Sequence, residues 1–229
     1  RFNLISLNDQ NNQFKVNDLL ISKKFKIINL KEAYFDYFDI NNYQNKFNII
    51  SKKDIYYLNG ASFNANKLID NIIDNEKSKT NFIDKNFNLN ISIDELFLDE
   101  NHILENFEGN LSINNQEIIN GNLIGYFSDN KKLKFTVRSK EKEKVTTLLL
   151  DNAKAIVSRY KFVNGFDEGI LDFNSSNKNG ESISKLKIYD FKLKELPALT
   201  KLLTLASLQG IADLLSGEGI RFDEFEMNF

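Results

Sequence analysis

A one-residue slip in the alternation of apolar side chains constrains this sequence more than any other feature. In the stretch ISIDELFL, apolar residues alternate at Ile91 and Ile93, two polar residues intervene, and alternation resumes at Leu96 and Leu98. Because successive side chains of a strand point to opposite faces, one extra residue would send the second half of the set to the wrong side. A β-bulge, or a short turn between two strands, would keep the set on one face and would bend the sheet.

The same spacing recurs along the chain, and simpler alternation lies between the slips. Polar turn signals such as DEN at 99–101 and SDNKK at 128–132 separate these short apolar runs, which is typical of an antiparallel meander. We therefore predict a mainly β protein, an elongated and curved antiparallel sheet that forms a repeating β-groove, with a few short α-helices and the main helical pair near the C-terminus. The further slipped sets are Phe14, Val16, Leu19 and Ile21; Ile28, Leu30, Ala33 and Phe35; Leu186, Ile188, Phe191 and Leu193; and Ile220, Phe222, Phe225 and Met227.

Three stretches have helical rather than strand periodicity. We predict helices at residues 64–75, 151–161 and 196–216, the second with Asp151 near its start, where the helix dipole favours an anion. The third stretch is the most hydrophobic part of the chain, and Gly210 divides it into two shorter helices. Its apolar stripe is expected to cover the end of the sheet or, alternatively, to lie on a membrane surface. The residues expected to dock this helical pair are Leu199, Leu202, Leu203, Ile211, Leu214 and Leu215.

The composition offers little for catalysis or metal binding. The formal net charge is −2, which does not favour a nucleic-acid partner, and the chain has no cysteine. The one histidine, His102, lies in a polar turn without neighbours at metal-ligand spacing. The carboxylate pairs Asp94–Glu95 and Asp223–Glu224 occupy slip positions, where we expect them to face solvent or to fill a bulge. We therefore predict no enzyme, no cofactor and no metal site.

A curled sheet without a second sheet to cover it would present a long apolar trough on its concave side. Acyl chains would fill such a trough, because burial of each methylene contributes about 0.8 kcal/mol. Composition alone does not distinguish this groove from a sandwich of two sheets that close on each other. The residues expected to line the groove are Ile91, Ile93, Leu186, Ile188, Ile220 and Phe222.

The end of the chain carries a longer and more specific pattern. Residues 187–229 read KIYDFKLKELPALTKLLTLASLQGIADLLSGEGIRFDEFEMNF and resemble the AsmA-like C-terminal region of large bacterial envelope proteins, the group that includes AsmA, TamB and YhdP. The resemblance is to a strand followed by a passage of the form aPalarLLslaSltGlldlLsGeGi.Fd.le..F. The matching residues are Pro197, Leu202, Leu203, Ala206, Ser207, Leu208, Gly210, Leu214, Leu215, Ser216, Gly217, Glu218, Gly219, Phe222, Asp223 and Phe229.

Two upstream segments are similar to other elements of this family. Residues 151–173 resemble a segment of the form D-a-g..l...g....l.gG.l.l, but Glu168 stands where a second glycine is usual. Residues 58–72 are similar to a short G.sfDarpll element, with Asn64 in place of the aspartate. The resemblance thus covers about two thirds of the chain and is specific only near its end. It divides the chain into a β-groove segment at 1–84 and an AsmA-like C-terminal segment at 85–229.

The resemblance implies a groove that projects through the periplasm from an inner-membrane anchor and takes part in phospholipid transport between the inner and outer membranes and in outer-membrane integrity. The chain begins at Arg1 without methionine, so we expect a piece of such an anchored protein. Phospholipid acyl chains are the expected partner, with a membrane surface or envelope proteins as further partners. The alternative is a structural or assembly module of similar shape that binds envelope protein partners.

Overall fold

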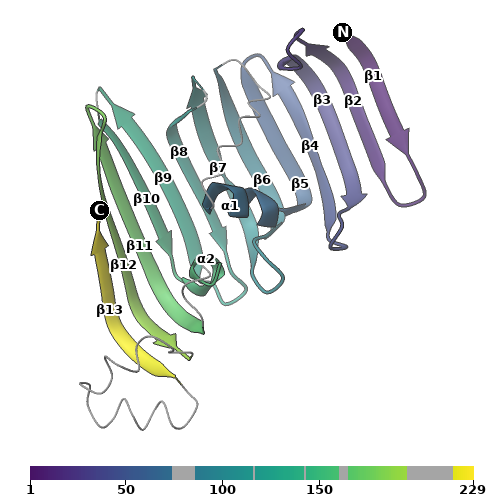
Figure 1. Ribbon diagram of the computed structural model, residues 1–229. Helices are drawn as coiled ribbons and strands as arrows, with labels where there is room; N and C mark the ends of the chain where they lie inside the picture. The colour runs from purple at the N-terminus through teal and green to yellow at the C-terminus, as the bar shows by residue number, and fades with distance from the viewer. Residues whose placement is uncertain (74–85, 116, 142, 160–164, 195–218) are drawn as a thin grey trace.

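The chain forms one open, curved sheet of thirteen strands that lie side by side in the order of the sequence (Figure 1). The computed structural model describes residues 1–73, 86–115, 117–141, 143–159, 165–194 and 219–229. The prediction of a mainly β, curved sheet is confirmed. The strands are β1 (Phe2–Asn8), β2 (Gln13–Ile21), β3 (Ile27–Phe38), β4 (Gln44–Lys52), β5 (Ile55–Asn64), β6 (Phe87–Phe97), β7 (Ile103–Asn114), β8 (Glu117–Tyr126), β9 (Lys132–Lys140), β10 (Glu143–Leu150), β11 (Phe166–Lys178), β12 (Glu181–Leu193) and β13 (Ile220–Asn228).

Neighbouring strands are antiparallel with one exception, the parallel pair β5 and β6. Helix α1 (Asn66–Ile73) begins directly after β5 and starts the connection between the two strands. A parallel pair needs such a crossover, because a tight turn can join only antiparallel strands. The predicted antiparallel sheet therefore contains one parallel pair.

All five predicted slips lie inside single strands, so none of them is a turn between two strands. In β6 the ladder pairs Ile93 with Phe107 and then Leu96 with Leu104, so that β6 and β7 each place two polar residues between the same two apolar pairs. The parallel ladder likewise joins Gly60 to Ile93 and continues in unchanged register past the slip. Three adjacent strands, β5, β6 and β7, therefore slip together.

Two of the register shifts occur where a slipped strand meets one that alternates regularly. The β4–β5 ladder shifts between Lys46 and Phe47, and the β7–β8 ladder shifts between Glu105 and Glu108. These two shifts border the three strands that slip together, because the extra residue of β5 or β7 has no counterpart in β4 or β8. The slip therefore forms a β-bulge where β5 meets β4 and where β7 meets β8. Within β5, β6 and β7 the extra residues lie opposite one another, and the register does not change.

The slips keep most of the apolar side chains on one face, as predicted. Ile93 and Leu96 are 1% and 7% exposed, and Ile188 and Phe191 are each 6% exposed. One assignment is wrong: Ile28 is exposed, because the ladder shifts at the start of β3 and places Ile27 opposite Ile21. Phe225 and Met227 pair with apolar-face residues of β12 but are exposed in the edge strand β13.

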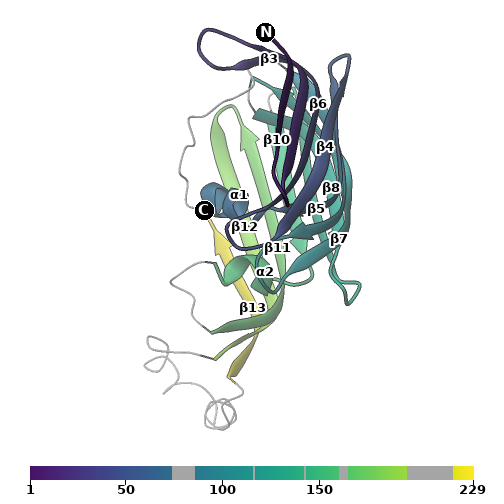
Figure 2. The ribbon, with the colours of Figure 1, turned by 90° about the vertical axis from the view of Figure 1, so that its right-hand side faces the viewer.

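Two short helices lie on the concave side of the sheet. Figure 2, seen from the β1 edge, shows the sheet curving around α1. Helix α2 (Lys154–Val157) is much shorter than predicted and packs near the start of β11. Asp151 does not serve this helix, since its carboxylate accepts a hydrogen bond from the backbone N–H of Lys132. The predicted helices at 196–216 lie outside the described residues.

The apolar side chains form two core clusters, and both contain residues from each side of residue 84. One cluster centres on Val16, Leu30 and Ala33 but also receives Leu89 from β6. The larger cluster includes Phe47 of β4 together with residues from β6 to β13 and both helices. The β5–β6 ladder also crosses the expected boundary. The sheet is therefore continuous through this point.

The left-handed backbone at the slip in β12 predicts which substitutions of Asp190 the fold can accept without loss of stability. Asp190 has φ 51° and an exposed side chain, and a β-branched residue is strained in this conformation. We expect Asp190→Val to lower the free energy of unfolding by about 1–2 kcal/mol, whereas Asp190→Gly retains stability. Urea denaturation measures both. The control is Asn174→Val at a regular, exposed strand position of β11, and an equal loss in that variant would contradict the explanation.

Candidate functional site

A single row of side chains crosses the entire sheet on its concave face, one residue from each strand, and contains no polar residue. We call it the central row. Each neighbour in the row is a direct ladder partner of the next, from β1 to β13. Its members are Ile5, Val16, Ala33, Ile49, Leu58, Ile91, Gly109, Leu123, Phe135, Leu148, Phe173, Leu186 and Met227.

The opposite face of the sheet is polar. On β12 and β13, for example, Lys187 forms ion pairs with both Glu224 and Glu226, and Lys185 also pairs with Glu226. These ion pairs raise the pKa of Lys187 and lower the pKa of Glu226 to about 2. An apolar concave face and a charged convex face give the sheet two sides of different chemistry.

Most of the central row is half-buried rather than enclosed. Val16 and Ala33 are buried, Met227 is exposed at the sheet edge, and the remaining members have intermediate exposure. Toward the lower end of the strands, as drawn in Figure 1, the same face is covered by α1 and α2, which contribute Ile69 and Val157 to the larger core. The concave face therefore has a covered end and a partly open middle.

The six residues predicted to line a groove all belong to the apolar face, but they differ in access. Ile91, Leu186 and Phe222 are half-buried. Ile93, Ile188 and Ile220 are 1%, 6% and 6% exposed and are core residues with little surface for a ligand. The six residues predicted to dock the C-terminal helices lie outside the described residues, namely Leu199, Leu202, Leu203, Ile211, Leu214 and Leu215.

Several members of the central row were not predicted as lining residues. Leu148 lies in an uninterrupted run of three leucines, so the alternation of apolar and polar residues does not indicate which face it occupies. Its neighbour Leu149 lies on the other face and is 38% exposed. Leu123 and Phe173 lie in regular alternation, which is the signal that identifies their face. Gly109 has φ 148°, and a Cβ there would lie 2.0 Å from the carbonyl oxygen of Asn122, so β7 and β8 approach too closely for a side chain.

Aromatic rings reinforce the apolar face at both ends of the sheet. Neighbouring rings of Phe14, Phe35, Phe47 and Phe63 lie 5.1, 4.7 and 5.3 Å apart across β2 to β5. A second group stacks Phe191 between Phe166 and Phe222, at 5.4 and 5.2 Å, across β11 to β13. Such contacts stiffen a surface that has no opposing sheet among the described residues.

Arg159 fixes the position of α1 over the apolar face. The side chain of Arg159 is 8% exposed. Its guanidinium donates to the side chain of Asn66 at 2.7 Å and to the carboxylate of Asp70 at 2.5 Å. It also donates to the carbonyl oxygen of Leu98, just past the end of β6. One side chain that follows α2 thus joins α1 and the sheet.

A second polar cluster holds the β3–β4 turn against the end of β5. Asn45 is 1% exposed, and its side-chain oxygen accepts the backbone N–H of Asn64 at 2.8 Å. The side chain of Asn64 donates to Asp39 at 2.6 Å and accepts the N–H of Asn66 at the start of α1. Burial raises the pKa of Asp39, but hydrogen bonds from Asn64 and from backbone amides outweigh it and lower the pKa.

The polar residues singled out in the sequence do not form a metal-binding group in the described part of the chain. His102 bonds Asp99 through Nδ1 at 2.8 Å in the β6–β7 turn, while Asp94 and Glu95 are exposed. Among the described residues, no group of three or more histidine, aspartate or glutamate side chains could hold a metal ion. Within the same residues, no helix has the length and apolar character needed to cross a bilayer.

Comparison of the chain with protein-family models, with curated proteins and with solved structures found no match. The resemblance of residues 187–229 to the AsmA-like region therefore stays a prediction. Much of the passage that carries it, 195–218, lies outside the described residues.

The Arg159 contacts predict that α1 depends on this one side chain. Arg159→Met keeps the length of the side chain but removes its donors, so we expect the free energy of unfolding to fall by about 2 kcal/mol. Hydrogen exchange should show lost protection in α1 before the sheet is affected. Lys67→Met, an exposed change in the same helix, is the control. Unchanged exchange in α1 would rule out the anchoring role.

The two lysines around Asp167 predict a stabilising effect that depends on pH. Hydrogen bonds from Lys154 at 2.8 Å and Lys194 at 2.6 Å lower the pKa of Asp167 from 3.8 to about 2. A lowered pKa stabilises the fold above 3.8, and this contribution is lost as the pH falls toward 2. Because the side chains of Lys154 and Lys194 are 42% and 49% exposed, solvent screens both ion pairs, and Asp167→Asn should cost only about 1 kcal/mol at neutral pH. Urea titrations at neutral and acidic pH should show the difference between the two proteins vanishing in acid.

Proposed function

We propose that this chain is a non-enzymatic lipid-binding module whose concave face holds acyl chains. The observation that carries the proposal is the central row, which remains apolar across all thirteen strands and is half-buried over most of its length. A sheet ordinarily buries such a face against another layer. Here the covering layer in the described residues is limited to α1 and α2 near one end.

The dimensions and energetics of this face suit hydrocarbon chains. With neighbouring strands about 4.8 Å apart, the central row extends for about 58 Å. Each methylene that leaves water against this surface contributes about 0.8 kcal/mol, so a few acyl chains would offset the exposure of the face. The binding would need no polar recognition along the row, because its members have no hydrogen-bonding side chains.

The local conformation at one resemblance position supports the same family context. Glu168 stands where the AsmA-like pattern usually has a glycine, and it has φ 62° beside Gly169 at φ 87°. A position that requires left-handed backbone favours glycine. Glu168 therefore differs from the AsmA-like pattern in its side chain but has the backbone conformation that a glycine would adopt there. We accordingly propose a segment of an inner-membrane-anchored periplasmic protein that carries phospholipid between the inner and outer membranes and supports outer-membrane integrity.

Charges placed on the apolar face test the lipid-binding proposal. Purified protein should retain phospholipid in native mass spectrometry. Phe135→Asp and Leu148→Asp, at half-buried positions of the central row, should reduce retained lipid at least tenfold, because each places a carboxylate against hydrocarbon. Lys134→Asp is the matched control, since it adds the same side chain on the opposite, exposed face of β9.

Two results would count against lipid binding. One is a wild-type protein that never carries phospholipid, even after incubation with vesicles. The other is equal lipid retention by the Phe135 and Lys134 variants, provided that circular dichroism shows that both are folded.

A second candidate, a structural or assembly module, is favoured by the edge strand β1. None of its residues is charged, and Phe2, Leu4 and Leu7 are 49%, 58% and 66% exposed. Natural sheets usually protect an edge with charged residues, as β13 does with Arg221 and its acidic neighbours. In this reading a partner strand would add to β1. Leu4→Lys should then abolish partner capture and leave lipid retention unchanged.

A further inference from the structure

Three hairpin turns of this sheet have the same hydrogen-bonded geometry but differ at one position. In each, two backbone bonds close the turn, and the fourth residue has left-handed backbone. That residue is Asn42 between β3 and β4, Asn130 between β8 and β9, and Phe25 between β2 and β3, with φ 63°, 63° and 59°. The N–H groups of these residues donate to the first residue of the turn at 2.9, 2.9 and 3.0 Å.

Phenylalanine is a costly choice at this position. Left-handed backbone suits glycine and asparagine, and a bulky residue there is an outlier. The chain uses asparagine at the two equivalent positions, so the turn itself does not demand an aromatic ring. The hydroxyl of Ser22 accepts the backbone N–H groups of Lys24 and Lys26, which holds the β2–β3 turn in shape. A local rule that is broken without gain in packing points to a role outside the fold.

The Phe25 ring gains nothing from the rest of the protein. It is 84% exposed at the tip of the turn. Lys23 and Lys24 precede it, and Lys26 follows it. The ring is thus an apolar group presented to solvent within a cluster of positive charges.

The neighbouring turn at the same end of the sheet adds to this charge. The β4–β5 turn carries Lys52 and Lys53, both exposed, and Lys53 also has left-handed backbone at φ 59°. Strands β2 to β5 are consecutive neighbours, so the two hairpin turns lie within about 10 Å of each other. We call the two turns, residues 22–26 and 52–54, the basic tip, which contains five lysines and one acidic residue, Asp54.

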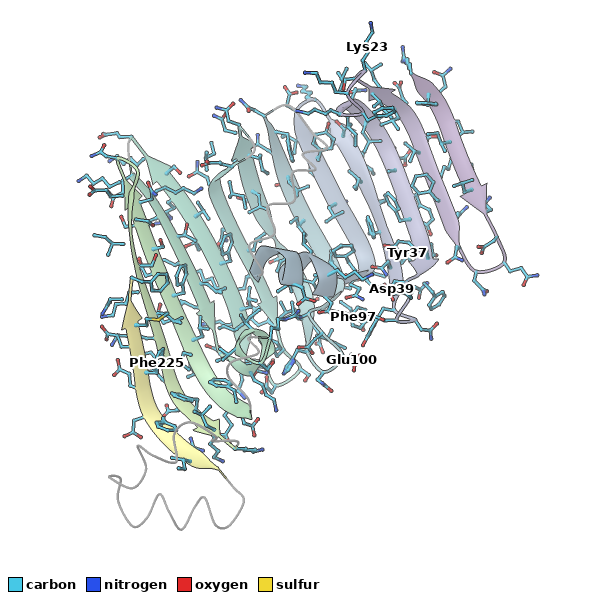
Figure 3. All side chains as sticks on the ribbon, in the orientation of Figure 1. Lys23, Tyr37, Asp39, Phe97, Glu100 and Phe225 are labelled. Atoms are coloured by element: carbon cyan, nitrogen blue, oxygen red, sulfur yellow. The ribbon has the colours of Figure 1, made fainter. Side chains whose placement is uncertain are left out.

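The opposite end of the same strands has the opposite charge. Figure 3 shows Lys23 at the upper end of the strands and Asp39 and Glu100 at the lower end. The three lower turns that join strands β1 to β7, at 9–12, 39–43 and 98–102, contain acidic residues and neither lysine nor arginine, whereas the next lower turn, at 127–131, contains both Asp129 and Lys131. Across strands β1 to β7 this segregation makes the basic tip suited to an anionic surface, whereas the opposite turns would be repelled by it.

We infer that the basic tip docks onto the surface of an anionic phospholipid bilayer, with the Phe25 ring inserted at the level of the headgroups. Lysines near such a surface are attracted to anionic lipids, and an exposed aromatic ring between them gains apolar contact there. The strained turn holds the ring outward before contact, so binding need not reorganise the hairpin. This inference does not rest on the proposed groove, because it concerns turns at the end of the sheet.

Asparagine at position 25 separates membrane binding from folding. Phe25→Asn copies the two equivalent turns, so it should keep or raise the urea midpoint. It should also weaken sedimentation with vesicles of equal parts phosphatidylglycerol and phosphatidylcholine by about tenfold. The double change Lys23→Ser and Lys24→Ser should weaken it by at least as much, with wild-type binding lost in high salt. Vesicles of phosphatidylcholine alone should bind wild type weakly.

Ile40 provides the matched control. It is 85% exposed in the equivalent turn between β3 and β4, at the acidic end of the sheet. Ile40→Ser removes an exposed apolar side chain of the same kind of turn and should leave vesicle binding unchanged.

A fluorescent reporter gives a second readout. The chain has no tryptophan, so Phe25→Trp and Ile40→Trp each introduce a single one. Emission from position 25 should shift to shorter wavelength with the anionic vesicles, and emission from position 40 should not. The inference would be overturned if wild type and Phe25→Asn bound the vesicles equally, or if Ile40→Ser weakened vesicle binding as much as Phe25→Asn does. It would also be overturned if the tryptophan emission at position 25 did not shift. Phe135→Asp should reduce the retained lipid without changing the binding to vesicles. The two proposals can therefore fail independently of each other.

Discussion

An apolar face that extends over thirteen strands must be kept from water, and this requirement governs the rest of the structure. Two packed sheets would meet it by closing on each other, but the described residues form a single open layer. Helices α1 and α2 cover the apolar face near one end, where the core residues Ile93, Leu104 and Leu150 are buried. Along the central row the side chains stay half-buried. The curvature, the short helices and the proposed acyl ligand are all responses to this one excess of apolar surface.

The slips show how a sheet of this kind can bend without losing the sidedness of its strands. One extra residue in a single strand would rotate its later side chains to the polar face. When neighbouring strands take the extra residue at the same level, their ladder keeps its register, as Ile93–Phe107 and Leu96–Leu104 do. The mismatch then moves to the margins of the group, where β4 and β8 alternate regularly and the ladders shift. The bend is therefore a property of several strands together.

Local patterns in the sequence predict the strands and the face of most apolar residues, because both depend on period two. They do not predict which strands slip together, since that depends on ladder partners far away in the sequence. Ile28 was assigned to the wrong face for this reason: a shift between β2 and β3 put Ile27 in its place. Access could not be predicted either, because burial of Ile188 depends on neighbouring strands and helices. The same holds for Arg159, whose partners Asp70 and Leu98 are distant in the sequence.

The segregation of charge between the two ends of strands β1 to β7 follows from a rule that links sequence to topology. Successive turns of an antiparallel meander alternate between ends, and the first four turns alternate in composition: Asp9, then Lys23 and its neighbours, then Asp39, then Lys53. The crossover between β5 and β6 interrupts this alternation. Had β6 run antiparallel to β5, the acidic turn at 98–102 would lie beside the lysines. Because the pair is parallel, that turn joins the other acidic turns, and the basic tip keeps five lysines against one acidic residue, Asp54.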